Sequence, residues 1–174
     1  MYYKIFATKK TLIEPQLPAD GAAVLSTGLD VEARVKKLFK GSLAIRVVTA
    51  GSTNACEQEL VALSNSFYDV ERFGVHFVAS PRHADMLMVT GPVSRNMREA
   101  LLRTYEAMPE PKIVVAVGDD AIGSGIFRGS YGVLDGAHNV VPVHYRIPGD
   151  PPSPGRILCA LLAILNDLEG NQKK

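Results

Sequence analysis

The stretch Ile113-Val114-Val115-Ala116-Val117 decides the fold. It is a run of apolar residues, mostly β-branched, and it shows none of the alternation with polar residues that a strand with one face in water would show. This pattern predicts a strand that is buried on both faces. Such a strand belongs in a parallel sheet with helices on both sides.

Shorter apolar runs and helical patterns alternate on either side of this stretch. Further strands are predicted at 44–49, 75–78, 86–89 and 140–143, and helices at 56–68, 94–107 and 154–168. Alternating strands and helices indicate right-handed βαβ units. We therefore predict an α/β fold, a compact three-layer flavodoxin-like domain with a mostly parallel sheet.

The N-terminal part of the chain has a different pattern. Residues 1–28 combine lysines, prolines and glycines without a sustained period, which is typical of an arm or a loop. Asp30 is predicted to cap a helix that continues to about Lys40. The predicted organisation is an N-terminal arm and helix at 1–41, an α/β domain at 42–170 and a tail at 171–174.

Composition excludes several classes of protein. The chain has 174 residues, 47% hydrophobic and 21% charged, with a net charge of +1, so nothing suggests nucleic acid as a partner. The longest apolar stretch, 157–165, is far shorter than the roughly 20 residues that span a bilayer, and the first residues lack a secretory signal. These features predict a cytoplasmic chain. Its two cysteines, Cys56 and Cys159, cannot fill the four ligand positions of a structural zinc or a [4Fe–4S] site.

Four loops should leave the carboxyl ends of the strands, at 50–56, 90–94, 118–125 and 148–152. They are rich in glycine, proline and short polar residues. In an open parallel sheet, ligands bind at this edge, where the strand order reverses. Tight turns between strands and helices have the same composition, so the loops alone leave both interpretations open.

Several segments together carry a resemblance to a known family. They are 51–57 (GSTNACE), 72–74 (RFG), 79–85 (ASPRHAD), 89–93 (VTGPV), 116–119 (AVGD) and 147–152 (IPGDPP). In this order and spacing, over about 42–165, the chain resembles the 20-kDa subunit of NADH:quinone oxidoreductase. The first loop is most similar to that of the small subunits of membrane-bound, energy-converting nickel–iron hydrogenases, where paired ligands are separated by two residues.

The resemblance implies a [4Fe–4S] cluster that faces a large-subunit partner. The family's four cysteine positions correspond here to Thr53, Cys56, Asp120 and Asp150, so one thiol remains. Cubane iron is held by thiolates, whereas hydroxyl and carboxylate oxygens are hard donors. We therefore expect no cofactor. The expected protein is a cluster-lacking small subunit that packs on the large subunit of a membrane-associated oxidoreductase or hydrogenase-like complex, and touches the membrane only through partner subunits.

Other interpretations remain open for the altered positions. Cys56, Asp120 and Asp150 could hold a divalent ion such as zinc or manganese, and aspartates on such loops also close turns or cap helices. An unusual metal or [4Fe–4S] site would make the chain an electron-transfer subunit. A stand-alone α/β ligand-binding module is the third possibility. The loops match neither common phosphate-binding motif.

Three further residues belong to the same motifs. The resemblance implies an interface or site-lining role for Arg82, with His83 beside it. Arg82 could equally form an ion pair with Asp85 or with Glu57. Glu57 is a further candidate for an interface or site-lining role; it follows Cys56 at a predicted helix start, where an acidic residue suits the helix dipole.

Overall fold

The computed structural model describes residues 11–12 and 21–172. Its sheet has six strands in the order β1-β6-β5-β4-β2-β3, and every neighbouring pair is parallel. The strands are β1 (Thr11–Leu12), β2 (Leu43–Thr49), β3 (Val75–Phe77), β4 (Met86–Thr90), β5 (Ile113–Val117) and β6 (Tyr145–Ile147). Without the two-residue β1, this is the 2-1-3-4-5 order of flavodoxin-like sheets. The predicted fold class is confirmed.

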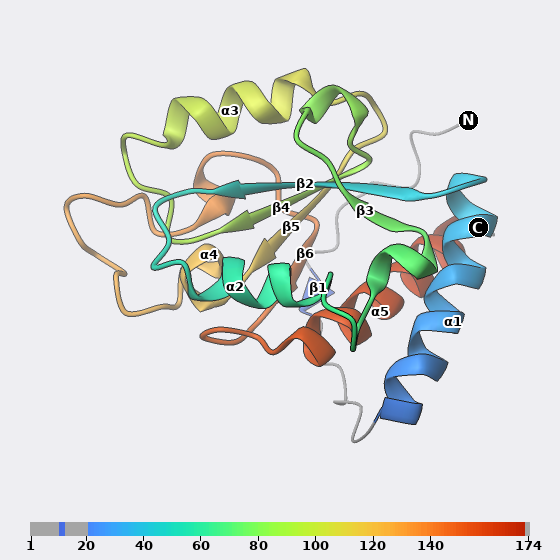
Figure 1. Ribbon diagram of the computed structural model, residues 1–174. Coiled ribbons are helices and arrows are strands. Elements are labelled where there is room, and N and C mark those ends of the chain that lie inside the picture. Colours follow the sequence, from blue (N-terminus) through green and yellow to red (C-terminus); the bar gives the residue numbers. More distant parts are fainter. Residues whose placement is uncertain (1–10, 13–20, 173–174) are drawn as a thin grey trace.

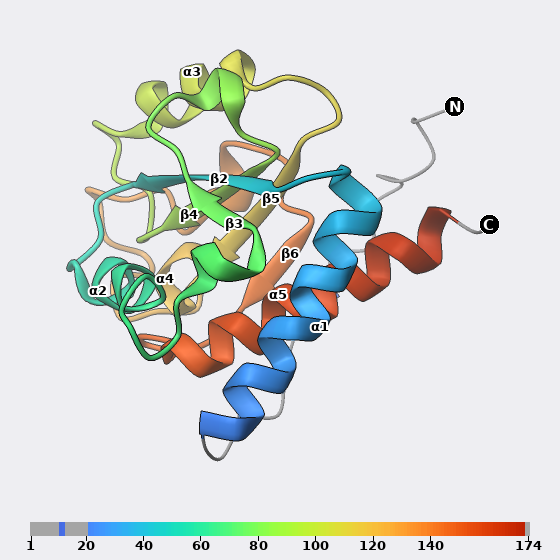
Figure 2. The same ribbon diagram turned by 45° about the vertical axis from the view of Figure 1, so that its right-hand side comes forward.

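Helices cover both faces of this sheet. They are α1 (Gly21–Phe39), α2 (Ala55–Ala62), α3 (Arg98–Ala107), α4 (Asp119–Ile122) and α5 (Pro154–Gln172). Figure 1 shows α3 on one side of the sheet and α1, α2 and α5 on the other. The turned view in Figure 2 shows the same three layers, with α1 lying across α5.

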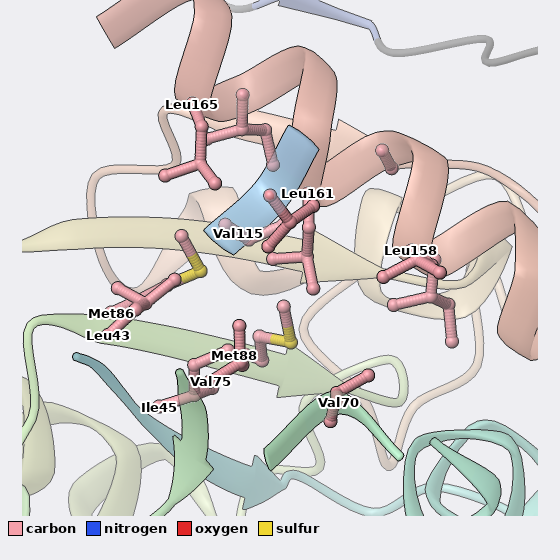
Figure 3. Packing of buried hydrophobic residues seen from close by; sticks show 14 of the residues in the cluster. Leu43, Ile45, Val70, Val75, Met86, Met88, Val115, Leu158, Leu161 and Leu165 are labelled. Atoms are coloured by element: carbon pink, nitrogen blue, oxygen red, sulfur yellow. The ribbon is translucent and has the colours of Figure 1, made fainter. Parts of the chain in front are cut away.

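Each face of the sheet has its own hydrophobic core. On one face, Met86, Met88 and Val115 pack against leucines of α5 (Figure 3). On the other face, Leu87 and Val114 pack in one cluster with Leu101 of α3. Every residue of β4 and of β5 is buried, as the uninterrupted apolar run predicts.

The last strand lies elsewhere than predicted. Residues 140–143 are not a strand; β6 begins at Tyr145 instead. Pro142 has no N–H to donate to a neighbouring strand, and the backbone pairing with β5 starts only at His144, whose N–H donates to Val114 O at 2.9 Å. Val141 and Val143 are nevertheless buried. The apolar pattern at 140–143 therefore reflects burial of these side chains and not pairing with a neighbouring strand.

The N-terminal prediction was wrong for residues 21–28 and 11–12. The helix begins at Gly21 rather than Asp30, and Thr11–Leu12 pairs with β6. Gly28 lies inside α1 and faces Phe73, where a larger residue would collide; an added Cβ would be 2.2 Å from that ring. The rest of the predicted arm, 1–10 and 13–20, is outside the described residues.

Other helix boundaries differ from the prediction by a turn or more. The helix predicted at 56–68 ends at Ala62, and Asn65 Oδ1 then accepts the N–H groups of Phe67 and Tyr68, which closes a turn. The helix predicted from residue 94 begins at Arg98. The last helix continues to Gln172, beyond the predicted end at 168. Within the described ranges, none of the helices combines the length and the apolar character that crossing a membrane requires.

Candidate functional site

Four strand-end loops meet at the carboxyl edge of the sheet, as the parallel topology requires. The loop after β2 leads into α2, the loop after β4 into α3, Gly118 joins β5 to α4, and 148–153 joins β6 to α5. The strand order reverses at β2 and β4, so this edge contains the position where flavodoxin-like folds bind ligands. Thr53, Cys56, Asp120 and Asp150 all lie on or beside these loops.

Glu57 links the first loop to the end of β4. Its carboxylate accepts a hydrogen bond from Ser52 Oγ at 2.8 Å and another from the fully buried Thr90 Oγ1. Ser52 Oγ in turn accepts the Asn54 N–H at 3.3 Å. A carboxylate with two hydroxyl donors makes strong, charge-assisted hydrogen bonds. The chain's own side chains therefore bridge the position between β2 and β4 where the strand order reverses.

The same two loops approach each other too closely for side chains at two glycines. A Cβ on Gly91 would lie 2.5 Å from the Ser52 nitrogen, and one on Gly51 would lie 2.9 Å from Ser94 Cβ. Both glycines also have positive φ angles, which other residues adopt at a cost. The glycines of these loops are therefore required for the loops to pack.

The Cys56 side chain points at Gly118. Cys56 is buried in the first turn of α2, and its Sγ is 2.5 Å from the position that a Gly118 Cβ would occupy. Burial, and to a smaller extent the negative charges of nearby carboxylates, together raise the pKa of the Cys56 thiol to about 12; the carboxylates are those of Glu57, Asp150, Asp120 and Asp119. The thiol is protonated near neutral pH and packs as a small apolar group.

Asp119 joins the third loop to the fourth. Its backbone N–H donates to Gly149 O at 3.0 Å, and its Oδ1 accepts the Gly149 N–H at 2.9 Å. The Gly118 N–H also donates to Ile147 O at 2.9 Å. The loops after β5 and β6 are therefore held together by both main-chain and side-chain hydrogen bonds.

The other three positions of the implied ligand set differ in exposure. Thr53 and Asp150 are exposed, whereas Asp120 is partly buried. Burial raises the pKa of Asp120, as do the charges of Asp150 and Asp119, while a hydrogen bond from the Phe127 backbone lowers it. Asp120 Oδ1 is buried without a hydrogen-bond partner. Among the described residues, no three histidine, cysteine, aspartate or glutamate side chains are grouped so that they could hold a metal ion.

Arg82 and His83 do not lie beside these loops. They are exposed, in a 3₁₀ turn (Pro81–His83) that precedes β4. The Asp85 N–H donates to Ala44 O at 2.9 Å and its Oδ2 accepts the Ala44 N–H at 3.0 Å, which places this segment at the amino end of β2. Asp85 and Glu57, the two partners considered for Arg82, thus have other hydrogen-bond donors.

Sequence reasoning missed the side chains that connect the loops. The candidate residues drawn from the sequence do not include Ser52, Thr90, Gly118 or Asp119. One available signal was a threonine at the end of the apolar run Met86-Leu87-Met88-Val89. A hydroxyl buried after such a run requires a hydrogen-bond partner.

Comparison with known proteins identifies the family. The model of the family "NADH ubiquinone oxidoreductase, 20 Kd subunit" matches residues 54–164. An uncharacterised protein of Methanocaldococcus jannaschii is 44% identical over 131 residues, which are 75% of this chain and 88% of that protein. A probable membrane-bound hydrogenase subunit of Pyrococcus furiosus is 42% identical over 121 residues, 70% of this chain and 72% of the relative.

Formate hydrogenlyase subunit 7 of Escherichia coli is 40% identical over 139 residues, 80% of this chain and 54% of the relative, so the chain spans about half of that protein. Among solved structures, a chain of the membrane-bound sulfane sulfur reductase, an archaeal respiratory membrane complex, matches with a TM-score of 0.67 and 31% identity, covering 82% of this chain and 76% of the other. The chain belongs to the family of the 20-kDa subunit of NADH:ubiquinone oxidoreductase, and the resemblance seen in its sequence is confirmed.

The residues at the carboxyl edge do not fit the [4Fe–4S] cluster that this family implies. Such a cluster is held by thiolates. Cys56 is the single thiol at the edge; Cys159 lies on α5, where it is hydrogen-bonded with Thr27 of α1. The remaining positions offer a hydroxyl and two carboxylates, which are hard donors.

Proposed function

We propose that the chain is a cluster-lacking 20-kDa-type small subunit that packs on the large subunit of a membrane-associated NADH:quinone oxidoreductase or hydrogenase-like complex. It contributes shape and a contact surface but no redox centre. The observation that carries this proposal is the donor set at the carboxyl edge, where one thiol packs against Gly118 and oxygen groups take the other positions.

The chemistry of iron explains why this donor set matters. Fe–S clusters depend on soft thiolate ligands, and a threonine hydroxyl is not ionised near neutral pH. One cysteine can be replaced by an oxygen ligand in some clusters, but three replacements leave no coordination sphere. A chain without a cluster cannot relay electrons itself, so its role in a complex is structural.

Exposed side chains support docking on a partner. Ile126 and Tyr131 are 80% and 92% exposed, in the segment that follows α4. This segment is proposed as part of the surface that contacts the large subunit. Arg82 and His83, exposed at the amino end of the sheet, are proposed as a second contact with neighbouring subunits.

The names of two relatives support a location at a membrane. The hydrogenase relative is named as membrane-bound, and the solved structure is a respiratory membrane complex. We place this chain on the cytoplasmic side of the membrane, attached through its partner subunits.

Iron and sulfide analysis tests the proposal. The complex is purified anaerobically from its native host, and the separate full chain is also treated with iron and sulfide under reducing conditions. We expect no iron bound to this chain and co-purification with a large subunit. About four irons per chain with broad visible absorbance would refute the absence of a cluster.

Two other outcomes would favour the alternatives. A different metal that is lost on Cys56→Ala would indicate an electron-transfer or metal site at Cys56, Asp120 and Asp150. A stable monomer without a large subunit in the native host would indicate a stand-alone module.

A further inference from the structure

We propose that the loop 123–136 is the anchor by which the chain docks on its large subunit, and that the surface it fits is an apolar pocket surrounded by carboxylates. The inference rests on the proposed function and deepens it, because it names the chemistry of the partner's surface. Three side chains on or against this loop carry it, those of Tyr131, Arg95 and Arg128.

Hydrogen bonds to the segment after β4 hold the backbone of the loop 123–136 in place. The Arg95 N–H donates to Gly132 O at 3.0 Å. The Leu134 N–H donates to Val93 O at 2.8 Å. Figure 1 shows the loop, in the orange colours that follow α4, extending beyond the carboxyl ends of the strands. A loop whose backbone bonds are already made loses little conformational entropy when it docks.

Tyr131 extends from this fixed backbone into solvent. Its carbonyl accepts the Arg95 Nε–H at 2.5 Å, while the residue is 92% exposed, so the ring makes almost no contact within the chain. Tyrosine is among the residues that dominate the binding free energy of protein interfaces, because its ring buries a large apolar area and its hydroxyl can still form a hydrogen bond. Ile126, 80% exposed, is a second apolar side chain of the same loop. A pocket that takes the Tyr131 ring must therefore be mainly apolar.

The exposed charges of this loop are positive. Arg128 lies within the loop and Arg95 bonds to it; both are exposed, and neither forms an ion pair in the part of the chain that the structure describes. Asp135, the one acidic residue of the loop, accepts a backbone N–H at 2.7 Å. Asp120, bonded to the Phe127 backbone, is partly buried. Two exposed guanidinium groups without a carboxylate partner are complementary to a surface that supplies carboxylates.

Recovery of the large subunit with affinity-tagged full-length variants, expressed in the native host, tests the anchor. Tyr131→Ser removes the ring, and we expect roughly tenfold less large subunit per chain than with the wild type, by quantitative mass spectrometry. Tyr131→Phe keeps the ring and should recover about as much as the wild type. Phe67→Ser is the matched control, since it removes another exposed aromatic ring, one that lies beside Gly21 of α1. Its recovery should equal that of the wild type.

Charge reversal tests the carboxylates around the pocket. Arg128→Glu would place like charges opposite each other, and we expect recovery to fall roughly tenfold. Lys40→Glu makes the same change of charge directly after α1, near the amino end of β2, and should have no effect. All of these positions except Phe67 are outside the hydrophobic clusters and every one is exposed, so urea unfolding should give nearly wild-type stability in each variant. A loss of recovery then reports a lost contact and not a lost fold.

The outcomes separate the inference from the proposed function. Equal recovery in Tyr131→Ser and the wild type overturns the inference, and so does an equal loss in Phe67→Ser. Equal recovery in Arg128→Glu and Lys40→Glu overturns the carboxylate-surrounded pocket. Absence of a large subunit from the wild-type sample would contradict the proposed function itself, so the two failures are distinguishable.

Discussion

The Cys56 thiol, with a pKa of about 12, is nearly all protonated at pH 8. Only the thiolate attacks an alkylating reagent, so a very small fraction of Cys56 is reactive at that pH. We expect Cys56 in the native chain to react with iodoacetamide on the order of a thousandfold more slowly than a free cysteine. Mass spectrometry of the labelled peptide measures this.

The unfolded protein is the control for this prediction. In denaturant both burial and the carboxylates around Cys56 are removed, so labelling should become as fast as that of an ordinary thiol. Rapid labelling of Cys56 in the native chain would show that the thiol is neither buried nor held against Gly118.

Gly118 has a backbone conformation that is nearly restricted to glycine. Its φ is 91° and its ψ is 156°. We expect Gly118→Ala to lower the free energy of unfolding by about 1–3 kcal/mol from backbone strain alone, with a further loss because the new Cβ would displace the Cys56 sulfur. Urea unfolding measures the change. Gly170→Ala, an exposed helical position with open space around it, is the control and should be neutral or stabilising by up to about 1 kcal/mol. Equal losses in both variants would contradict the assignment.

At the residue scale, sequence placed the implied ligand positions but not their environment. The resemblance to the family selects Thr53, Cys56, Asp120 and Asp150, which lie in or beside the segments predicted to follow strands. The bonds of Glu57 to Ser52 and Thr90 could not be predicted, because they depend on how closely two loops approach. That approach is set by contacts such as Gly91 against Ser52, which join residues far apart in the sequence.

Glu169 connects two helices that are distant in sequence. Its side chain is 7% exposed and accepts hydrogen bonds from Arg34 and from Lys37 of α1. We expect Glu169→Gln to lower the free energy of unfolding by about 1–2 kcal/mol, because the two partners are partly exposed and regain water when the pair is lost. Urea unfolding with an unchanged slope measures this loss.

The exposed pair of Glu32 with Lys36 is a suitable control within the same helix. It joins residues one turn apart, and Lys36 is 67% exposed. Glu32→Gln should cost about 0.3–0.5 kcal/mol. If both variants lose the same amount, Glu169 is not an anchor between α1 and α5.

His144 makes the link between β5 and the start of β6 dependent on pH. Val114 donates its N–H to His144 Nδ1 at 2.9 Å, and His144 donates its own N–H to Val114 O. Burial lowers the pKa of His144, while the charge of Glu110 raises it to a smaller extent. The unfolded chain, with a histidine pKa of about 6.5, therefore takes up a proton before the folded chain does.

Folding stability should fall as the pH decreases below about 6.5, by at most about 1.4 kcal/mol per pH unit, and the loss should stop below the folded-state pKa. His144→Asn keeps an oxygen that can accept the Val114 N–H but does not titrate. Urea unfolding between pH 7 and 5 should therefore show a shallower pH dependence in this variant. An identical pH dependence in both proteins would contradict the role of His144.

At the element scale, prediction succeeded where burial and backbone pairing coincide. β4 and β5 are buried at every residue and were located to within one residue. Residues 140–143 are apolar and yet form no strand, since Pro142 cannot donate a hydrogen bond. Gly28 in α1 is there because of Phe73, and no local pattern in the sequence reports a contact between residues so far apart.

At the scale of the whole molecule, the parallel topology brings the implied ligand positions to one edge. All neighbouring strands are parallel, so every loop that follows a strand leaves the same side of the sheet. The sequence sufficed for this conclusion because strand direction follows from the alternation of strands and helices. The shape of a partner cannot be inferred in this way, because the surface of another chain is not encoded in this one.

Restoring three thiols tests whether the edge still has the geometry of its family. The triple variant Thr53→Cys, Asp120→Cys and Asp150→Cys turns the three oxygen donors into soft sulfur ligands. Together with Cys56 it has four cysteines, with 64 residues from position 56 to position 120 and 30 from position 120 to position 150. We expect this variant to take up about four irons per chain under anaerobic reconstitution, because soft donors are what the native edge lacks. The matched control replaces the same three residues with serine, which has the size of cysteine but an oxygen donor, and should bind no iron. A folded triple-cysteine variant without iron would mean that these positions do not converge, since the donor chemistry would then no longer be the limiting factor.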